Sequence, residues 1–239
     1  MRRRGRHCAR LLACAALAAV TVPVAGHAQY YEQEGSRPPG ERYLSAGVLW
    51  KSFSPLPSNT SPTPLDYRIV VPAIGLHLEN LDVQFSYGRY STVPGSQSTV
   101  SLNALYSLDV ALTGAPRSGL SLPLLVGADY TRSGGGGMQS EFNVGSIGLG
   151  VGLRYRKAGS GAHFSVGGGA IAQLGFAAFR PVYGFSGAVI GDATLLLTRF
   201  PLFGSLALGY RVRYQTWSLS DHVLRYSCLM HGPFVGVLL

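Results

Sequence analysis

Apolar and polar side chains alternate along most of this chain, and the alternation restricts its fold more than any other feature. In the stretch GSIGLGVGLRYR (residues 145–156), Gly148, Gly150 and Gly152 are separated by single aliphatic residues. A period of two places alternate residues on opposite faces of a β-strand. A nucleotide-binding loop would instead need the spacing G-x-G-x-x-G at the start of a helix. We therefore interpret this stretch as a strand with one glycine face and one aliphatic face.

The same period of two recurs in ten segments of the chain. In residues 81–90, for example, Leu81, Val83, Phe85 and Tyr87 alternate with polar residues or glycine. Such alternation is typical of strands that have one apolar face. The predicted strands are 43–53, 66–78, 81–91, 99–112, 119–131, 142–156, 162–178, 186–199, 204–217 and 228–239.

The lengths of these segments and of their connections favour a membrane barrel. Strands of soluble sheets usually have about five or six residues, whereas a strand that crosses a bilayer needs about 9–11. Longer polar connections, such as STVPGSQS and RPVYGFS, follow the odd-numbered segments, and mostly shorter ones follow the even-numbered segments. Short turns on one side and longer loops on the other are typical of outer-membrane barrels. The sequence predicts an all-β, closed, antiparallel up-and-down transmembrane β-barrel of about ten strands over residues 42–239, with eight or twelve strands as alternatives.

The first 28 residues have the composition of a secretory signal peptide. Five arginines and an apolar run from Leu11 to Val22, too short for a membrane-spanning helix, precede Gly26 and Ala28. We predict a cleaved signal peptide over 1–28, with export to the outer membrane, and a flexible periplasmic lead-in over 29–41.

Charge and cysteine content narrow the protein class further. The whole chain carries a formal net charge of +9, but the mature part keeps 15 basic and 11 acidic residues, so its net charge of +4 predicts no nucleic-acid partner. Only Cys228 remains after residue 28, so the mature chain has no intramolecular disulfide. Charged residues make up 13% of the chain, about half the share usual in soluble proteins. This low share disfavours a secreted soluble β-sandwich or a lipocalin-like barrel, which would turn a charged face to water.

Together these features resemble the small outer-membrane β-barrel proteins of Gram-negative bacteria. The signal sequence, the alternation, the asymmetry of the connections and the terminal segment HGPFVGVLL carry the resemblance. It implies outer-membrane lipid as the surroundings and recognition of the C-terminal strand by the barrel-insertion machinery. That family usually ends its last strand with an aromatic residue, whereas this sequence ends with Leu239. The sequence does not indicate an oligomeric state.

The side chains predicted to face inward include acids and bases in nearly equal number. Buried charges need partners, so we expect interior ion pairs in a narrow lumen. The predicted lumen charge network comprises Asp82, Asp109, Arg154 and Arg156 toward the periplasmic end, Lys51, Asp129, Arg211 and Arg213 toward the outer end, and Asp192.

Aromatic residues on the aliphatic face predict girdles at the membrane interfaces. The predicted girdle residues are Trp50, Tyr87, Tyr130 and Tyr214 toward the outer ends of their strands, and Tyr155 and Phe164 beside a periplasmic turn. Pro72 lies inside the second segment, where it removes a ladder hydrogen bond; it predicts either a bulge or that this segment is not a strand.

The sequence leaves three functions open. The first is a barrel without evident catalytic activity that has a structural or surface-interaction role; this is the function that we expect. The second is a small narrow channel, although ten strands are far fewer than the 16–18 that leave an aqueous channel. The third is a rim hydrolase built from groups such as His163, Ser165 or Ser220–Asp221–His222. The spacing of Cys and His predicts no metal site, and we expect no cofactor.

Overall fold

The computed structural model describes most of the chain after residue 41. The predicted signal peptide (1–28) and lead-in (29–41) lie outside the described residues, so their assignment stays a prediction. The described ranges are 42–57, 59–60, 64–92, 95–115, 118–134, 141–159, 164–179, 182–200, 204–219 and 224–239.

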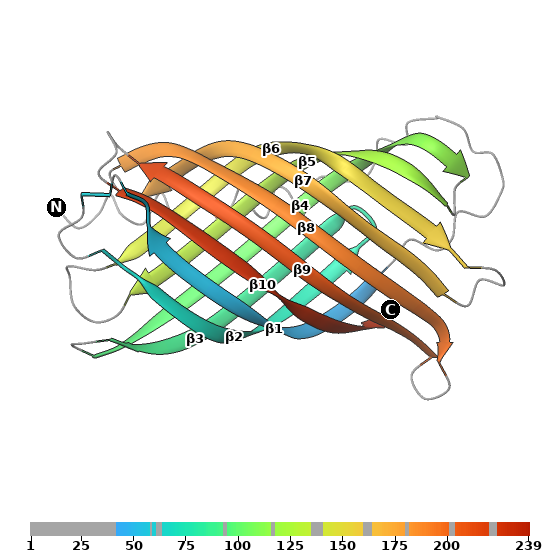
Figure 1. The fold of residues 1–239 in the computed structure, drawn as a ribbon, viewed down its shortest axis with the longest axis horizontal. Helices are drawn as coiled ribbons and strands as arrows, with labels where there is room; N and C mark the ends of the chain where they lie inside the picture. Colours follow the sequence, from blue (N-terminus) through green and yellow to red (C-terminus); the bar gives the residue numbers. More distant parts are fainter. Residues whose placement is uncertain are drawn as a thin grey trace, which may run out of the picture. The chain divides into compact units, whose positions relative to one another are not determined.

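Ten antiparallel strands form a closed barrel in which each strand pairs with its neighbours in the chain and β1 pairs with β10 (Figure 1). This confirms the predicted all-β, up-and-down barrel and its strand number. The strands are β1 (Arg42–Pro55), β2 (Tyr67–Leu78), β3 (Leu81–Thr92), β4 (Gly95–Ala115), β5 (Ser118–Gly134), β6 (Phe142–Ala158), β7 (Phe164–Phe179), β8 (Val182–Phe200), β9 (Gly204–Leu219) and β10 (Leu224–Leu238).

The strands are staggered as they go round the barrel. A row of paired residues that starts at Tyr43 passes through every strand and returns to β1 at Pro55, twelve residues further along. A closed barrel with such a stagger must tilt its strands, by about 35–45° relative to the axis in typical barrels, and Figure 1 shows strands that run obliquely to the long axis of the barrel. Residues in one row therefore lie at different heights in the barrel.

The alternation in the sequence corresponds to the two faces of the barrel wall. In β6, Ile147, Leu149 and Val151 are exposed on the outside, whereas the glycines between them face inward. A Cβ atom on Gly148 would lie 2.8 Å from the Gln173 amide nitrogen, and one on Gly127 would lie 2.6 Å from it. The glycine face of GSIGLGVGLRYR thus leaves room for a long side chain of the next strand.

Two of the expected long connections are shorter than the sequence predicted. β3 ends at Thr92 and β4 begins at Gly95, while β7 ends at Phe179 and β8 begins at Val182. Much of the polar segments STVPGSQS and RPVYGFS therefore continues the strands. Backbone pairing thus extends beyond the residues whose alternation of apolar and polar side chains marked the strands. The longest connection at this end of the barrel runs from 56 to 66.

Candidate functional site

The middle of the barrel interior contains an ion pair that is almost completely buried. Arg213 Nη2 on β9 lies 2.5 Å from Asp129 Oδ1 on β5, and both side chains are at most 4% exposed. Gln215 completes the group: its Oε1 accepts a hydrogen bond from Arg213 Nε at 3.2 Å, and its Nε2 donates to Asp129 and to Ser146. The pair thus bridges opposite walls of the barrel, and each charge has a polar partner, as burial requires.

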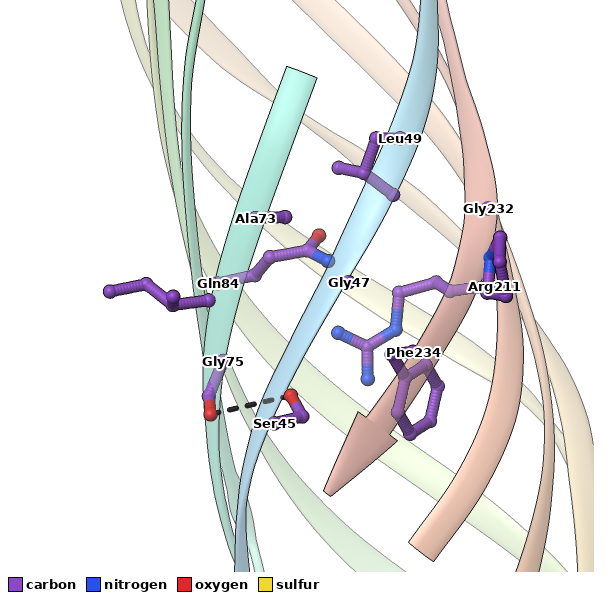
Figure 2. Close-up of a pocket in the computed structure, with 11 residues that line it drawn as sticks. Ser45, Gly47, Leu49, Ala73, Gly75, Gln84, Arg211, Gly232 and Phe234 are labelled. Atoms are coloured by element: carbon purple, nitrogen blue, oxygen red, sulfur yellow. Dashed lines mark hydrogen bonds between the residues drawn. The ribbon is translucent and has the colours of Figure 1, made fainter. Parts of the chain in front are cut away.

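A second ion pair lies closer to the chain termini. Arg211 donates from both terminal nitrogens to the two carboxylate oxygens of Asp82, with 3.1 Å between Nη1 and Oδ1. His77 Nδ1 lies 3.6 Å from the same carboxylate. Figure 2 shows the Arg211 guanidinium beside the ring of Phe234, and its central carbon is 5.7 Å from the ring centroid. Such a bidentate contact fixes the arginine in both position and orientation.

The height that we predicted for Arg211 is wrong. The sequence placed Arg211 toward the outer end and Asp82 toward the periplasmic end, yet the two residues are partners. The prediction compared positions along each strand and neglected the stagger of the barrel. Because of the stagger, paired residues in one row lie farther and farther from the end that carries Arg42 as the row passes from β1 through β2 to β10.

The structure distributes the other predicted interior charges as follows. Arg154 Nη1 donates to Asp109 Oδ2 at 2.9 Å in a partly exposed pair. Asp192 is opposite Arg211 in the pairing of β8 with β9, and both line the same small cavity. Arg156 lies two residues beyond Arg154 on the same face of β6 and is paired in register with Gly119 and Gly167.

Lys51 is a predicted interior charge whose hydrogen bonds, among the described residues, go to hydroxyl groups and not to an acid. Its ammonium donates to Thr99 Oγ1 at 2.6 Å and to Ser101 Oγ at 2.7 Å, and the residue is 1% exposed. No carboxylate of the described residues lies within 4.0 Å of it. Hydroxyl oxygens therefore replace the water shell of this lysine.

Sequence reasoning missed a layer of inward-facing aromatic side chains at the end of the barrel where β1 ends. Its members stack or meet edge to face around Phe53, whose ring centroid lies 5.0 Å from those of Phe142 and Tyr226 and 6.0 Å from that of Trp217. Parity could have found these residues, because each has inward parity near the same end of its strand. We call them the aromatic layer: Phe53, Tyr67, Tyr90, Phe142, Trp217 and Tyr226, which are all buried.

The aromatic layer and the ion pairs fill part of the barrel interior. Phe53 is 0% and Trp217 is 1% exposed. Two cavities toward the opposite end measure about 10 and 30 Å³, while a single water needs roughly 10–15 Å³ measured in this way. Figure 2 shows the smaller cavity, between β1, β2 and the Arg211 side chain. Neither cavity holds more than a few water molecules.

All six predicted girdle residues lie on the outer face. Trp50, Tyr87, Tyr130, Tyr155, Phe164 and Tyr214 are each at least 36% exposed. Trp50 also stacks on His231, at 5.7 Å between ring centroids, and His231 Nδ1 is 2.6 Å from the Tyr210 hydroxyl. Their position in a membrane interface stays a prediction.

Metal binding or hydrolysis would need ligating or nucleophilic side chains placed together among the described residues. They contain no group of three or more His, Cys, Asp or Glu side chains placed to hold a metal ion, and no helix among them is long and apolar enough to cross a membrane. His77 lies beside a carboxylate, but Asp82 is already held by Arg211. His163 and the Ser220–His222 sequence lie outside the described residues.

Comparisons with known proteins give architectural likeness only. No family model matches the chain, and no curated protein matches it. Among solved structures, the outer membrane protease OmpT of Escherichia coli matches with a TM-score of 0.36 and 8% identity, over 84% of this chain and 98% of that one. Ail, the attachment invasion locus protein of Yersinia pestis, matches with a TM-score of 0.24 and 11% identity over 82% and 98%. Omp33 of Acinetobacter baumannii matches with a TM-score of 0.25 and 8% identity over 84% and 100%. The matched proteins are outer-membrane barrels, and the comparisons indicate no subfamily.

Proposed function

We propose that this chain is an outer-membrane barrel that is closed to solutes, has no catalytic activity of its own and acts through its exposed surface. The observation that carries this proposal is the packed interior. The aromatic layer crosses the lumen at one end, and the Asp129–Arg213 and Asp82–Arg211 pairs cross it below. A conducting lumen would need a continuous polar path, and the buried rings of the aromatic layer speak against one.

The outer face supports insertion in lipid. Large apolar side chains on every strand point away from the barrel axis; Leu149, for example, is 69% exposed and Leu174 is 77% exposed. Exposed apolar surface on this scale is unfavourable in water and suits the apolar band, about 25 Å tall, of an outer-membrane barrel. A closed barrel also satisfies its backbone within the protein, as hydrocarbon requires.

The connections suggest how the barrel is oriented. Both described chain ends, Arg42 and Leu239, lie at the end that carries the connections 79–80, 116–117, 159–163 and 201–203. The opposite end carries the aromatic layer, the two-residue connections 93–94 and 180–181, and the longer connections 56–66, 135–141 and 220–223, so its connections are longer on average. Since short turns are periplasmic in outer-membrane barrels, we place the aromatic layer toward the cell exterior.

Conductance in planar bilayers tests the closed state. We expect the purified, reconstituted protein to give no steady conductance steps. The double variant Phe53→Ala/Trp217→Ala removes two large rings from the aromatic layer, and we expect it to conduct, which shows that inserted protein is present. Steady, reproducible steps from the unmodified protein would refute the closed barrel.

Two further measurements test the remaining parts of the proposal. We expect the folded protein to need detergent for extraction and to migrate differently on gels with and without heating. Lipid and peptide substrates should not be turned over by the purified protein, and turnover that depends on this chain would refute the non-enzymatic role.

A further inference from the structure

Of all neighbouring strands in the barrel, β2 and β3 are paired over the fewest residues. Their pairing runs from Leu78–Leu81 only to Ala73–Ser86. On its other side, β2 stays paired with β1 as far as Tyr67, and β3 stays paired with β4 as far as Thr92. The segment around Pro72 is a strand, and its pairing with β1 continues through Pro72 without a register shift, so neither alternative predicted from Pro72 holds on that side. On the β3 side, Pro72 is the first residue beyond the paired part.

The unpaired part of this seam begins at the level of the outward aromatic residues. Trp50 is opposite Val70 in the pairing of β1 with β2, and Tyr87 is the first residue of β3 beyond its pairing with β2. Unpaired backbone groups are very costly in hydrocarbon, at several kcal/mol each. Their position here therefore fits the headgroup region, where water and polar headgroups can hydrogen-bond to them.

We call residues 67–72 of β2 and 87–92 of β3 the unpaired seam. Each strand contributes one exposed arginine to it, Arg68 on β2 and Arg89 on β3. Tyr87 fixes one of them, because Arg89 Nε donates to the Tyr87 hydroxyl at 2.8 Å. Within the described residues, neither guanidinium has a carboxylate within 4.0 Å. Asp66, which is two residues before Arg68, also forms no ion pair with the described part of the chain.

Two other exposed arginines have carboxylate partners. Arg42 pairs with Glu79 at 2.8 Å, and Arg132 pairs with Glu141 at 2.9 Å. The seam therefore differs in carrying two like charges that the described residues leave uncompensated. An anion between them would relieve their repulsion, and guanidinium groups bind phosphate in a bidentate geometry.

We propose that Arg68 and Arg89 bind a phosphate group of a membrane lipid headgroup at the mouth of the β2–β3 seam. This inference rests on the proposed membrane insertion and orientation, under which the lipid is a phosphorylated glycolipid of the outer leaflet. A lipid is favoured over an extended peptide because both arginines lie on the outward face, beside the aromatic residue Tyr87, and not on the free strand edge itself.

Native mass spectrometry of the full chain in detergent, titrated with a bis-phosphorylated lipid A, tests the proposal. The double variant Arg68→Gln/Arg89→Gln removes both charges. Arg132→Gln is the matched control, because it removes one exposed outward arginine that already has a carboxylate partner. Hydrogen bonds to charged groups contribute about 1.5–3 kcal/mol each, so we expect the double variant to bind the lipid at least about 10-fold more weakly.

The control should bind within about twofold of the unmodified protein. Lipid A whose phosphates have been removed should bind the unmodified protein as weakly as the phosphorylated lipid binds the double variant. The variant Asp66→Asn removes a nearby negative charge and should bind more tightly, and this gain cannot come from misfolding. The heat-dependent gel shift confirms that all variants fold.

Three outcomes would overturn the lipid site: equal affinity of the double variant and the control, equal binding of the two forms of lipid A, or displacement of the lipid by an unphosphorylated extended peptide. A conducting barrel that still shows the arginine-dependent lipid affinity would refute the closed state and leave the lipid site intact. The two proposals therefore fail separately.

Discussion

The Asp129–Arg213 pair offers the sharpest test of how the interior stabilises the barrel. Replacing Asp129 with alanine would leave the Arg213 guanidinium buried, with Gln215 Oε1 at 3.2 Å as the remaining described partner. Removing one member of a buried ion pair typically costs about 3–5 kcal/mol, because the other charge stays uncompensated. We expect Asp129→Ala to lower the free energy of unfolding by this amount.

The matched control is the exposed pair between Arg132 and Glu141, whose side chains are 55% and 44% exposed. Exposed ion pairs contribute about 0–1 kcal/mol, so Glu141→Ala should have little effect. The double variant Asp129→Ala/Arg213→Met removes both buried charges and should recover most of the lost stability, since a buried pair can often be replaced by apolar residues without loss.

Urea titration of the protein folded into lipid vesicles, followed by tryptophan fluorescence, provides the measurement. Trp217 reports on the interior and Trp50 on the lipid-facing surface, so the two signals should change together if unfolding is two-state. If Asp129→Ala cost no more than Glu141→Ala, or if the double variant were less stable than Asp129→Ala alone, the reasoning about the buried charge would be refuted.

Three further substitutions test other parts of the structure by the same titration. Gly175→Ala should prevent or strongly weaken folding, because its Cβ would lie 2.2 Å from a backbone oxygen, while Gly191→Ala, with its nearest atom at 3.7 Å, should fold normally; equal behaviour would contradict the packing. Leu149→Arg should destabilise by about 2–4 kcal/mol if that residue faces the bilayer interior, whereas Tyr183→Arg, one residue after β8 begins, should cost much less. Lys51→Met should keep or raise stability because the ammonium lacks a described acidic partner, and a loss above about 2 kcal/mol would show that its charge is compensated.

The alternation in the sequence was enough to predict the barrel and which face each side chain occupies. It predicted the outward Leu149 and the inward Lys51 and Arg213, because parity along a strand decides the face whatever the tertiary context. The strand ends were harder to predict: β4 begins at Gly95, several residues before the predicted strand, because residues 95–98 include no apolar side chain and so show no alternation.

The aromatic layer escaped prediction for a related reason. We expected inward residues to be glycine or charged, as along most of β6, and did not apply the same parity to the ends of the strands. Trp217 lies three residues after the outward Tyr214, so parity alone places it inside. That the inward rings gather at one level of the barrel is a property of the stagger, which the sequence does not state.

Because the strands are staggered, the ion pairs also restrict the register of each strand, which the alternation alone does not. A slip of one residue would turn every apolar side chain of a strand inward, but a slip of two keeps both faces intact. If β9 slipped by two residues, Arg213 could take the place of Arg211 beside Asp82, but Asp129 would then face an uncharged residue and remain buried without its counter-ion. Since an uncompensated buried charge costs several kcal/mol, the two pairs together separate the observed register from registers that the hydrophobic pattern allows equally. The alternation of apolar and polar side chains thus fixes which face of each strand points outward. The buried charges fix the position of each strand along the barrel axis.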